Sequence, residues 1–526
     1  MPSSRALLQA FLLLGGASST LAHLHSRTDG VSWGACEFEA PGIECANFTV
    51  PLDYTTSDSE ATLDLQLLRV PAIQTPKKGT VLFNFGGPGL EARLTLAGSA
   101  ATYLALTNGE YDLVAFDPRG TANTMTASCF NTSAERALLV SQPMTVVPNT
   151  DDELALGRLW GQTGIVADSC LNALGEQLSL IGTSFVAQDM LQIVDALEDD
   201  GLLRYWGTSY GTALGATFAA MYPDRVERMI LDGNLNPHEY FNFYEIEVWA
   251  DSDRVFLNLL KECMKTPDLC ALAHRRDHVE DLEKDIYNLI EDLRKEPLIS
   301  GTTLVDSSLV KTYLRFGLYS PIFYPVVARS LNELLDGNAT QLANSYNALS
   351  SAGVILTQAD DDAQLAITCS DKKLPEQSFT EMAPVFEALE DQSRLLGSHG
   401  HIAAMLCQQW GVEAKGRYEG NFEATTNHPM LIINNRFDPA TPIRSAQNVS
   451  AGFENSVLLE NGGFGHGLTS HASTCTINAI RQYYQDGTLP EPGTICDVDY
   501  SPFDAIANNI TTVLTELGYL PGSGAQ

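Results

Sequence analysis

Residues 202–222 read LLRYWGTSYGTALGATFAAMY. A short apolar run leads into Gly207-Thr-Ser209-Tyr-Gly211, and a helix-like run of small residues follows. A strand, a sharp turn and a helix around G-x-S-x-G are typical of a nucleophile elbow, where the turn strains the serine backbone and lifts its hydroxyl above the sheet. A side chain in place of Gly207 or Gly211 would strike the neighbouring strand or helix. An ordinary glycine-rich turn is the alternative, but the flanking strand and helix favour the elbow.

Buried strands alternate with helices on both sides of this stretch. Strands are expected at 80–85, 111–117, 228–232, 430–435 and 456–460, with a helix at 185–199 and an edge strand at 62–72. This alternation predicts an α/β protein whose mostly parallel sheet is covered by helices on both faces.

The pattern changes in the middle of the chain. From 238 to 426 the sequence reads mainly as amphipathic helices, for example at 281–293, and strand signals nearly vanish. At 526 residues, the chain is also too long to fold around one simple hydrophobic core. We therefore predict a core formed by 23–237 and 427–526, with a helical cap inserted at 238–426. Because ligands in open α/β sheets bind beyond the carboxyl ends of the strands, a cap placed there would wall in the pocket.

Composition and charge exclude several classes of function. The chain is 44% hydrophobic and 18% charged, as in an ordinary globular protein. Its net charge is −34, so phosphates would be repelled, and neither nucleic acid nor an anionic membrane surface is an expected partner. The charge fits a soluble protein in an acidic or salty extracellular medium.

The first 22 residues, 1–22, are predicted to be a secretory signal peptide. Arg5 precedes an apolar run at 6–14, and Thr20-Leu21-Ala22 forms a small-x-small cleavage site. The run is too short to span a membrane, and no later segment reaches about 18 uninterrupted apolar residues. We therefore expect a secreted protein without a membrane anchor.

The cysteines and sequons fit this expectation. All ten cysteines lie beyond the signal peptide, and an even number in a secreted chain indicates disulfides. Sequence alone leaves their connectivity open, but pairing of neighbours would join Cys36 to Cys45, Cys129 to Cys170, Cys263 to Cys270, Cys369 to Cys407 and Cys475 to Cys496. No pair has C-x-x-C spacing, so no zinc site, redox chemistry or cofactor is expected. Sequons predict glycosylation of Asn47, Asn131, Asn338, Asn448 and Asn509.

Two residues near the C-terminus could activate Ser209. A serine hydroxyl is a weak nucleophile until a base takes its proton, and the base needs a third group to hold its tautomer. In a fold with this elbow the order along the chain is serine, acid, histidine. Asp438 and His466 each follow one of the last two predicted strands. We predict a catalytic triad of Ser209, Asp438 and His466, with Asp232 as the alternative acid.

Other histidines have ordinary interpretations. His471 is expected on the surface of the following helix, and His428 at a strand entry. His399 and His401 could suggest a metal pair, but without a nearby carboxylate pattern a loop is favoured.

Acyl transfer also needs donors for the developing oxyanion, with one side-chain donor worth roughly 3–4 kcal/mol. The Tyr210 N–H, next to the nucleophile, is one candidate. The loop after the strand at 80–85 supplies the other, because Gly86 and Gly87 leave its backbone bare and Pro88 stiffens the turn. We favour Gly87, with Gly86 as the alternative; a simple tight turn is the other interpretation. The loop lacks the sequence of a phosphate-binding motif.

Motifs spread along the chain identify a family. They are Gly-Gly-Pro-Gly at 86–89, Phe-Asp-Pro-Arg-Gly at 116–120, Gly-Thr-Ser-Tyr-Gly-Thr at 207–212, Leu-Asp-Gly at 231–233, Ile-Thr-Cys-Ser-Asp at 367–371, Cys-Gln-Gln-Trp at 407–410, Asp-Pro-Ala-Thr-Pro at 438–442, Gly-His at 465–466, and Gly-Thr-Leu-Pro at 487–490 with Cys496. Over about 36–500 the chain resembles the proline iminopeptidase and tripeptidyl aminopeptidase family of α/β-hydrolases. The resemblance implies an α/β-hydrolase fold, the same triad, and a secreted serine exopeptidase that removes residues or short peptides from free N-termini.

The glycine loop departs from the family. There the loop continues Gly-x-Ser-Gly, whereas Leu90-Glu91-Ala92 follows Gly89 here, and Phe85 stands where relatives often have His or Pro. An esterase, a lactonase or a tailoring hydrolase acting on a small natural product is therefore the second hypothesis. A catalytically silent binding protein is the third. Relatives recognise the free α-amine with acidic cap residues, and the candidates, each of which could equally be a solvated carboxylate, are Glu91, Glu239, Glu245, Glu247 and Asp251.

The expected partner is thus a peptide or a small-molecule acyl substrate, and the sequence does not indicate an oligomeric state.

Overall fold

The computed structural model describes residues 30–57, 60–132, 134, 135, 150, 152–351 and 358–521. The predicted signal peptide, 1–22, lies outside these residues. None of the described helices combines the length and apolar character that a membrane span needs.

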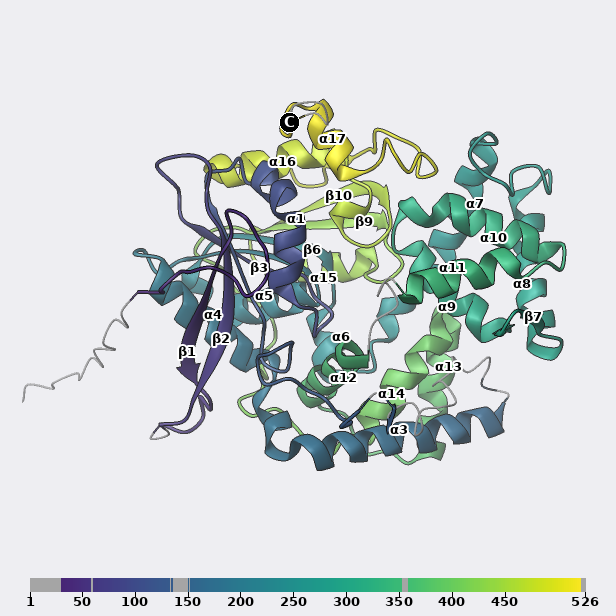
Figure 1. Ribbon diagram of the computed structural model, residues 1–526, viewed down its shortest axis with the longest axis horizontal. Coiled ribbons are helices and arrows are strands. Elements are labelled where there is room, and N and C mark those ends of the chain that lie inside the picture. Colours follow the sequence, from purple (N-terminus) through teal and green to yellow (C-terminus); the bar gives the residue numbers. More distant parts are fainter. Residues whose placement is uncertain are drawn as a thin grey trace, which may run out of the picture.

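A twisted sheet forms the centre of the α/β part (Figure 1). In the described chain its strand order is β1-β2-β4-β3-β5-β6-β9-β10-β11. β2 pairs antiparallel with β1 and β4, and the other neighbours are parallel. The predicted edge strand, β2, is therefore not at the edge, because β1 covers it. The strands are β1 (Glu44–Pro51), β2 (Thr62–Val70), β3 (Thr80–Asn84), β4 (Asp112–Phe116), β5 (Leu203–Ser209), β6 (Val226–Asn234), β9 (Leu431–Phe437), β10 (Val457–Phe464) and β11 (Ile495–Cys496).

Helices cover both faces of this sheet, as the alternating pattern predicted. Successive strand residues point to opposite faces, so Tyr205 and Trp206 of β5 belong to different hydrophobic clusters. Burial on both faces explains why the central strands are continuously apolar. The helices are α1 (Ala92–Leu106), α16 (Thr474–Asp486) and α17 (Ile510–Glu516) on the Trp206 face, and α4 (Thr183–Leu197), α5 (Tyr210–Met221) and α15 (Ile443–Gly452) on the Tyr205 face.

Between β6 and β9 the described chain is mostly helical, and most of its helices share a separate hydrophobic core beside the sheet in Figure 1, whereas α6 and α12 pack into the core on the Tyr205 face. The predicted cap, 238–426, lies within this stretch. An earlier helix, α3 (Glu153–Leu174), packs against α14 and contributes Leu156 and Leu159 to the separate core. The elements are α6 (Pro237–Asn242), α7 (Ser252–Lys265), α8 (Val279–Lys295), β7 (Leu298–Ser300), β8 (Thr303–Val305), α9 (Ser307–Leu318), α10 (Tyr324–Leu335), α11 (Thr340–Ser351), α12 (Gln358–Asp371), α13 (Ala383–Gln392) and α14 (Gly400–Gln408).

Five disulfides join the cysteines, and all five confirm the pairing of neighbours. They are Cys36–Cys45, Cys129–Cys170, Cys263–Cys270, Cys369–Cys407 and Cys475–Cys496. By closing loops in the unfolded chain, such bonds favour the folded state.

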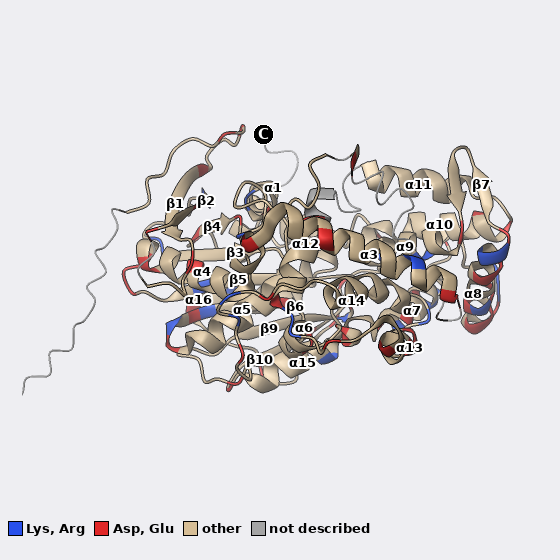
Figure 2. Cartoon of the chain, turned by 90° about the horizontal axis from the view of Figure 1, so that it is seen from below, with Lys and Arg blue, Asp and Glu red and all other residues tan. Residues whose placement is uncertain are grey.

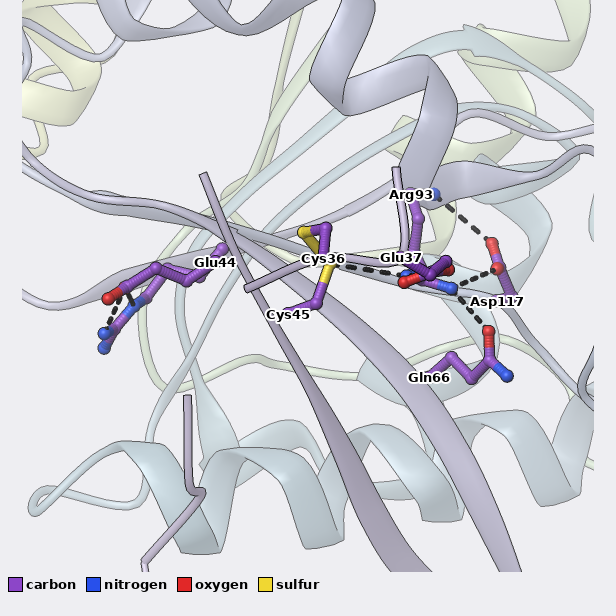
Figure 3. The surroundings of a disulfide bond; sticks show 8 residues. Cys36, Glu37, Glu44, Cys45, Gln66, Arg93 and Asp117 are labelled. Atoms are coloured by element: carbon purple, nitrogen blue, oxygen red, sulfur yellow. Dashed lines mark hydrogen bonds and ion pairs between the residues drawn. A yellow bond between two sulfur atoms is a disulfide. The ribbon is translucent and has the colours of Figure 1, made fainter. Parts of the chain in front are cut away.

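Beside the Cys36–Cys45 disulfide, a buried arginine ties the first turn of α1 to the sheet (Figure 3). The Arg93 guanidinium donates to Glu37 and Gln66 and lies 3.7 Å from the Asp117 carboxylate at the end of β4. Burial raises the pKa of Asp117 to about 6, although Arg93 opposes this shift. These contacts hold the start of α1, and with it the glycine loop that precedes it.

Charged residues are spread over both the sheet part and the helical part (Figure 2). The sequon residues lie on the surface as well: four of the five are exposed, and Asn509 is half-buried and caps α17. Their glycosylation stays a prediction. The four exposed residues are Asn47, Asn131, Asn338 and Asn448.

Candidate active site

Ser209 lies in a strained turn between β5 and α5. Its φ of 58° and ψ of −125° are unusual for a residue with a side chain. A Cβ at Gly207 would lie 2.2 Å from the Gly211 carbonyl oxygen, and one at Gly211 would lie 2.5 Å from the Asn84 carbonyl oxygen of β3. The expected steric reason for both glycines is confirmed, and the turn has the geometry of a nucleophile elbow.

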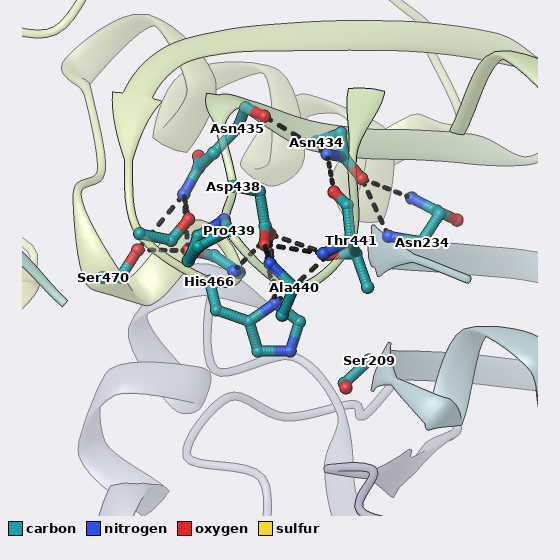
Figure 4. Close-up of polar contacts among 12 residues, drawn as sticks. Ser209, Asn234, Asn434, Asn435, Asp438, Pro439, Ala440, Thr441, His466 and Ser470 are labelled. Atoms are coloured by element: carbon teal, nitrogen blue, oxygen red, sulfur yellow. Dashed lines mark hydrogen bonds and ion pairs between the residues drawn. The ribbon is translucent and has the colours of Figure 1, made fainter. Parts of the chain in front are cut away.

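His466 and Asp438 contact each other directly (Figure 4). The Nδ1 of His466 lies 3.0 Å and 3.1 Å from the two carboxylate oxygens of Asp438. Asp438 also accepts from the N–H groups of Ala440 and Thr441 and from the Thr441 hydroxyl. These donors bond to the carboxylate oxygens of Asp438, so Asp438 acts as an acceptor toward His466 as well. The Nδ1 of His466 is therefore protonated, and its Nε2 is free to accept a proton.

Ser209 lies on the side of the imidazole away from Asp438 (Figure 4). Within the described chain no hydrogen bond joins its hydroxyl to His466; such bonds are often long until substrate binds. Burial disfavours the charged imidazole, but the charge and hydrogen bond of Asp438 outweigh burial and raise the pKa of His466 above its ordinary value of 6.5. The arrangement can therefore pass a proton from Ser209 to a histidine of increased basicity.

Asp232, the alternative acid, occupies a different position. Its carboxylate accepts from the Leu468 N–H at 2.8 Å and makes no hydrogen bond to His466 in the described chain. Burial raises the pKa of Asp232 to about 7. Asp232 thus supports the loop after His466, while Asp438 contacts the imidazole.

Two adjacent asparagines of β9 hold the two loops in place (Figure 4). Asn434 donates to the Thr441 carbonyl at 2.8 Å, which fixes the turn after Asp438. Asn435 donates to the carbonyls of Gly465 and Gly467, on either side of His466. The relative position of Asp438 and His466 is therefore set by buried side chains of β9.

The glycine loop lies against the elbow. A Cβ at Gly86 would lie 2.8 Å from the Cβ of Ser209, so only glycine fits there. The Gly86 N–H donates to the Asn84 side chain at 3.0 Å, whereas no group in the described residues accepts the Gly87 N–H. Tyr210 is the first residue of α5, where helix N–H groups lack partners within the helix. Gly87 and Tyr210 therefore stay the predicted pair of donors.

A cavity of about 510 Å³ opens beside Ser209. It is within the roughly 300–1,000 Å³ typical of small-molecule sites. Both parts of the molecule line it, among them Gly87, Ser209 and Thr441 from the sheet part and Tyr240, Trp249 and Arg315 from the helical part.

The end of α9 contacts the histidine loop, which the sequence did not indicate. Tyr319, which follows α9, accepts the His466 N–H on its carbonyl at 2.7 Å, and its ring packs edge-on to the imidazole at 5.1 Å. The amphipathic pattern of α9 gives a buried face but not the neighbour against which that face packs. No motif could have identified Tyr319.

Of the acidic candidates for amine recognition, Glu245 lines the cavity. Its carboxylate forms an ion pair with Lys372 at 3.0 Å. Glu247 instead accepts a hydrogen bond from Ser445 at 2.6 Å. The candidates outside the cavity lining are Glu91, Glu239, Glu247 and Asp251.

Two interpretations of histidines were wrong. His471 is buried rather than on a helix surface, and its Nε2 bonds to the Tyr500 carbonyl at 3.1 Å. His399 ends the 3₁₀ turn before α14 and His401 lies in the first turn of α14, so neither is in a loop. His399 lines the cavity and stacks on Trp249 at 5.9 Å. In the described residues no three potential metal ligands gather.

Comparisons with known proteins agree with this geometry. Residues 393–496 match the model of TAP-like proteins, and residues 80–306 match that of the alpha/beta hydrolase fold. The serine protease Hip1 of Mycobacterium tuberculosis is 27% identical over 492 residues, which cover 89% of this chain and 91% of the relative. The tripeptidyl aminopeptidase of Streptomyces coelicolor is 25% identical over 514 residues, 92% and 89% of the two chains. Carboxylesterase B of Mycobacterium tuberculosis is 27% identical over 544 residues, 94% and 98% of the two chains.

Proposed function

We propose that this chain, which has the α/β-hydrolase fold and matches the model of TAP-like proteins near its C-terminus, is a secreted serine exopeptidase that releases residues or short peptides from free N-termini. Its relatives support a serine peptidase. The observation that carries the proposal is the gathering of Ser209, Asp438 and His466 at the carboxyl ends of three parallel strands, beside a walled cavity.

In the proposed reaction His466 Nε2 takes the proton of Ser209 as its oxygen attacks the substrate carbonyl. Asp438 stabilises the imidazolium that forms. The N–H groups of Gly87 and Tyr210 receive the negative charge that develops on the carbonyl oxygen. His466 then protonates the leaving amine, and water, activated by the same base, releases the acyl group from Ser209. No step requires a metal or cofactor.

The walled cavity favours exopeptidase action over cleavage within long chains. Helices between β6 and β9 form much of its wall, so a long peptide has little room beyond the reacting bond. We propose that the Glu245 carboxylate binds the free amine of the substrate. The substrate amine then replaces Lys372 as the partner of Glu245. Glu91 and Glu247 remain candidates, although neither lines the cavity. The five disulfides and the exposed sequons support secretion and glycosylation.

An esterase, a lactonase or a tailoring hydrolase is the second candidate. Two observations favour it: the relative named carboxylesterase B, and the Leu90-Glu91-Ala92 sequence after the glycine loop.

A digest of peptides with free or acetylated N-termini, together with aryl esters, tests the proposal. We expect cleavage of free-amine peptides near their N-termini, lost in the acetylated partners because the amine then carries no charge. Ser209→Ala protein purified in the same way is the control for contaminating peptidases. Hydrolysis of esters or acetylated peptides only would overturn the exopeptidase assignment in favour of the second candidate.

The pH dependence of kcat/KM follows from His466. The base works only when neutral, and the pKa of His466 is raised above 6.5 by Asp438. We therefore expect activity to fall as the pH decreases, along an acid limb whose midpoint lies above pH 6.5. A profile of kcat/KM from pH 4 to pH 9 measures it, and circular dichroism at each pH shows that the fold persists. Full activity well below pH 6 would contradict His466 as the base.

A further inference from the structure

Arg315 lines the same cavity as Ser209. It lies on α9, three residues after Thr312 and four before Tyr319, and both of these also line the cavity. This spacing places all three on one side of the helix. The Tyr319 ring packs against the His466 ring. Arg315 is four residues before Tyr319 and therefore lies about 6 Å from it along the helix axis. The guanidinium therefore shares the cavity with the reacting groups.

The charge of Arg315 is not neutralised by the protein. Among the described residues no carboxylate pairs with it and no acceptor takes its N–H groups, and its Nε is buried without a partner. Its guanidinium lies 5.4 Å from the Trp249 ring and 5.6 Å from the Phe316 ring, so its surroundings are aromatic. A partly buried cation without an acceptor is costly, and the chain has 65 acidic residues that could have supplied one.

The other titratable groups of the cavity wall do not cancel this charge. The Glu245 carboxylate is paired with Lys372, whose ammonium also donates to the Tyr240 carbonyl. Burial and the nearby charges of Arg315 and Lys311 hold the pKa of His399 well below its ordinary value, so His399 is neutral. The wall therefore presents one uncompensated positive charge.

We propose that Arg315 binds a carboxylate of the substrate. This inference rests on the proposed function and specifies its substrate class: short peptides that carry a carboxylate close to the bond that is cleaved. A guanidinium can bind a carboxylate through two parallel N–H···O bonds, and the aromatic rings around Arg315 hold its plane in place. The carboxylate has two sources, an acidic side chain or the C-terminal carboxyl group of a very short peptide.

Matched peptides test this proposal and separate the two sources. In one set, C-terminally amidated peptides with a free N-terminus differ only by Glu or Gln at each of the first four positions. In the other, neutral tripeptides and tetrapeptides end in a carboxylate or an amide. We expect the carboxylate member of at least one set to have a kcat/KM roughly 10- to 100-fold higher. Arg315→Met should remove this preference but keep hydrolysis of the neutral peptide, and Arg315→Lys should keep part of it.

Arg276→Met is the matched control, because Arg276 is exposed, pairs with Asp285 and does not line the cavity. It should keep the full preference. If Arg315→Met fails to fold, the affinities of Ser209→Ala protein for the Glu and Gln peptides, measured by calorimetry, replace it. Equal kcat/KM or equal affinity within both sets, or a preference that survives Arg315→Met, would overturn the proposal. Cleavage of the neutral free-amine peptides by the unaltered protein separates this failure from failure of the proposed function, in which none of these peptides would be cleaved.

Discussion

Replacing Ser209 by alanine is expected to lower kcat by roughly 10⁶-fold, to a residual rate that the oxyanion donors and substrate binding alone support. The other groups of the site stay in place, so substrate should still bind with a Kd close to the KM of the unaltered protein where chemistry is slow. Single-turnover assays with the free-amine peptide that the unaltered protein cleaves fastest, together with calorimetry on the variant, measure both quantities. An unchanged rate would show that another residue, or another protein in the sample, is the nucleophile.

Ser209→Gly is a useful companion variant, because it separates the hydroxyl from the backbone. Alanine keeps the Cβ and therefore the strain at a φ of 58°, whereas glycine adopts this conformation freely. Both variants should be equally inactive. Relief of strain, typically 1–3 kcal/mol, outweighs the roughly 0.5–1 kcal/mol entropic cost of glycine, so the glycine variant should have the higher Tm. A lower Tm for the glycine variant would contradict a strained elbow.

The elbow and the strand ends were predictable from local patterns. Gly207 and Gly211 are required by contacts with the helix and with the neighbouring strand, and such contacts recur wherever a strand turns sharply into a helix. Asp438 and His466 could be found because each lies within two residues of the end of a strand, and the carboxyl ends of parallel strands meet at one edge of the sheet.

Contacts made by the helices between β6 and β9 were not predictable in this way. Arg315 and Tyr319 reach the cavity because α9 packs over the histidine loop, and an amphipathic pattern does not reveal such a partner. His471 was misplaced for a related reason: its position just before α16 looks like a helix surface, but its ring fills a buried site between β10 and the C-terminal segment. Long-range packing decided each of these positions.

Asp438→Asn and Asp232→Asn should differ strongly in activity, although both replace a buried carboxylate at the same end of the sheet. At Asp438 every neighbour is a donor: three backbone N–H groups, the Thr441 hydroxyl and His466 Nδ1. An amide there must turn its NH₂ toward a donor, which favours the wrong imidazole tautomer. We expect kcat to fall by roughly 10⁴-fold.

At Asp232 one backbone N–H, that of Leu468, is the donor, and an amide oxygen can accept it equally well. We therefore expect kcat to change by less than about 10-fold. Because the charge of Asp232 helps to raise the pKa of His466, its removal should move the acid limb of kcat/KM to lower pH. Parallel pH profiles of the two variants measure both effects, with Tm as the control for folding. A larger loss in Asp232→Asn than in Asp438→Asn would assign the role of the acid to Asp232, since the hydrogen bond to Nδ1 would then not be the one that orients the base.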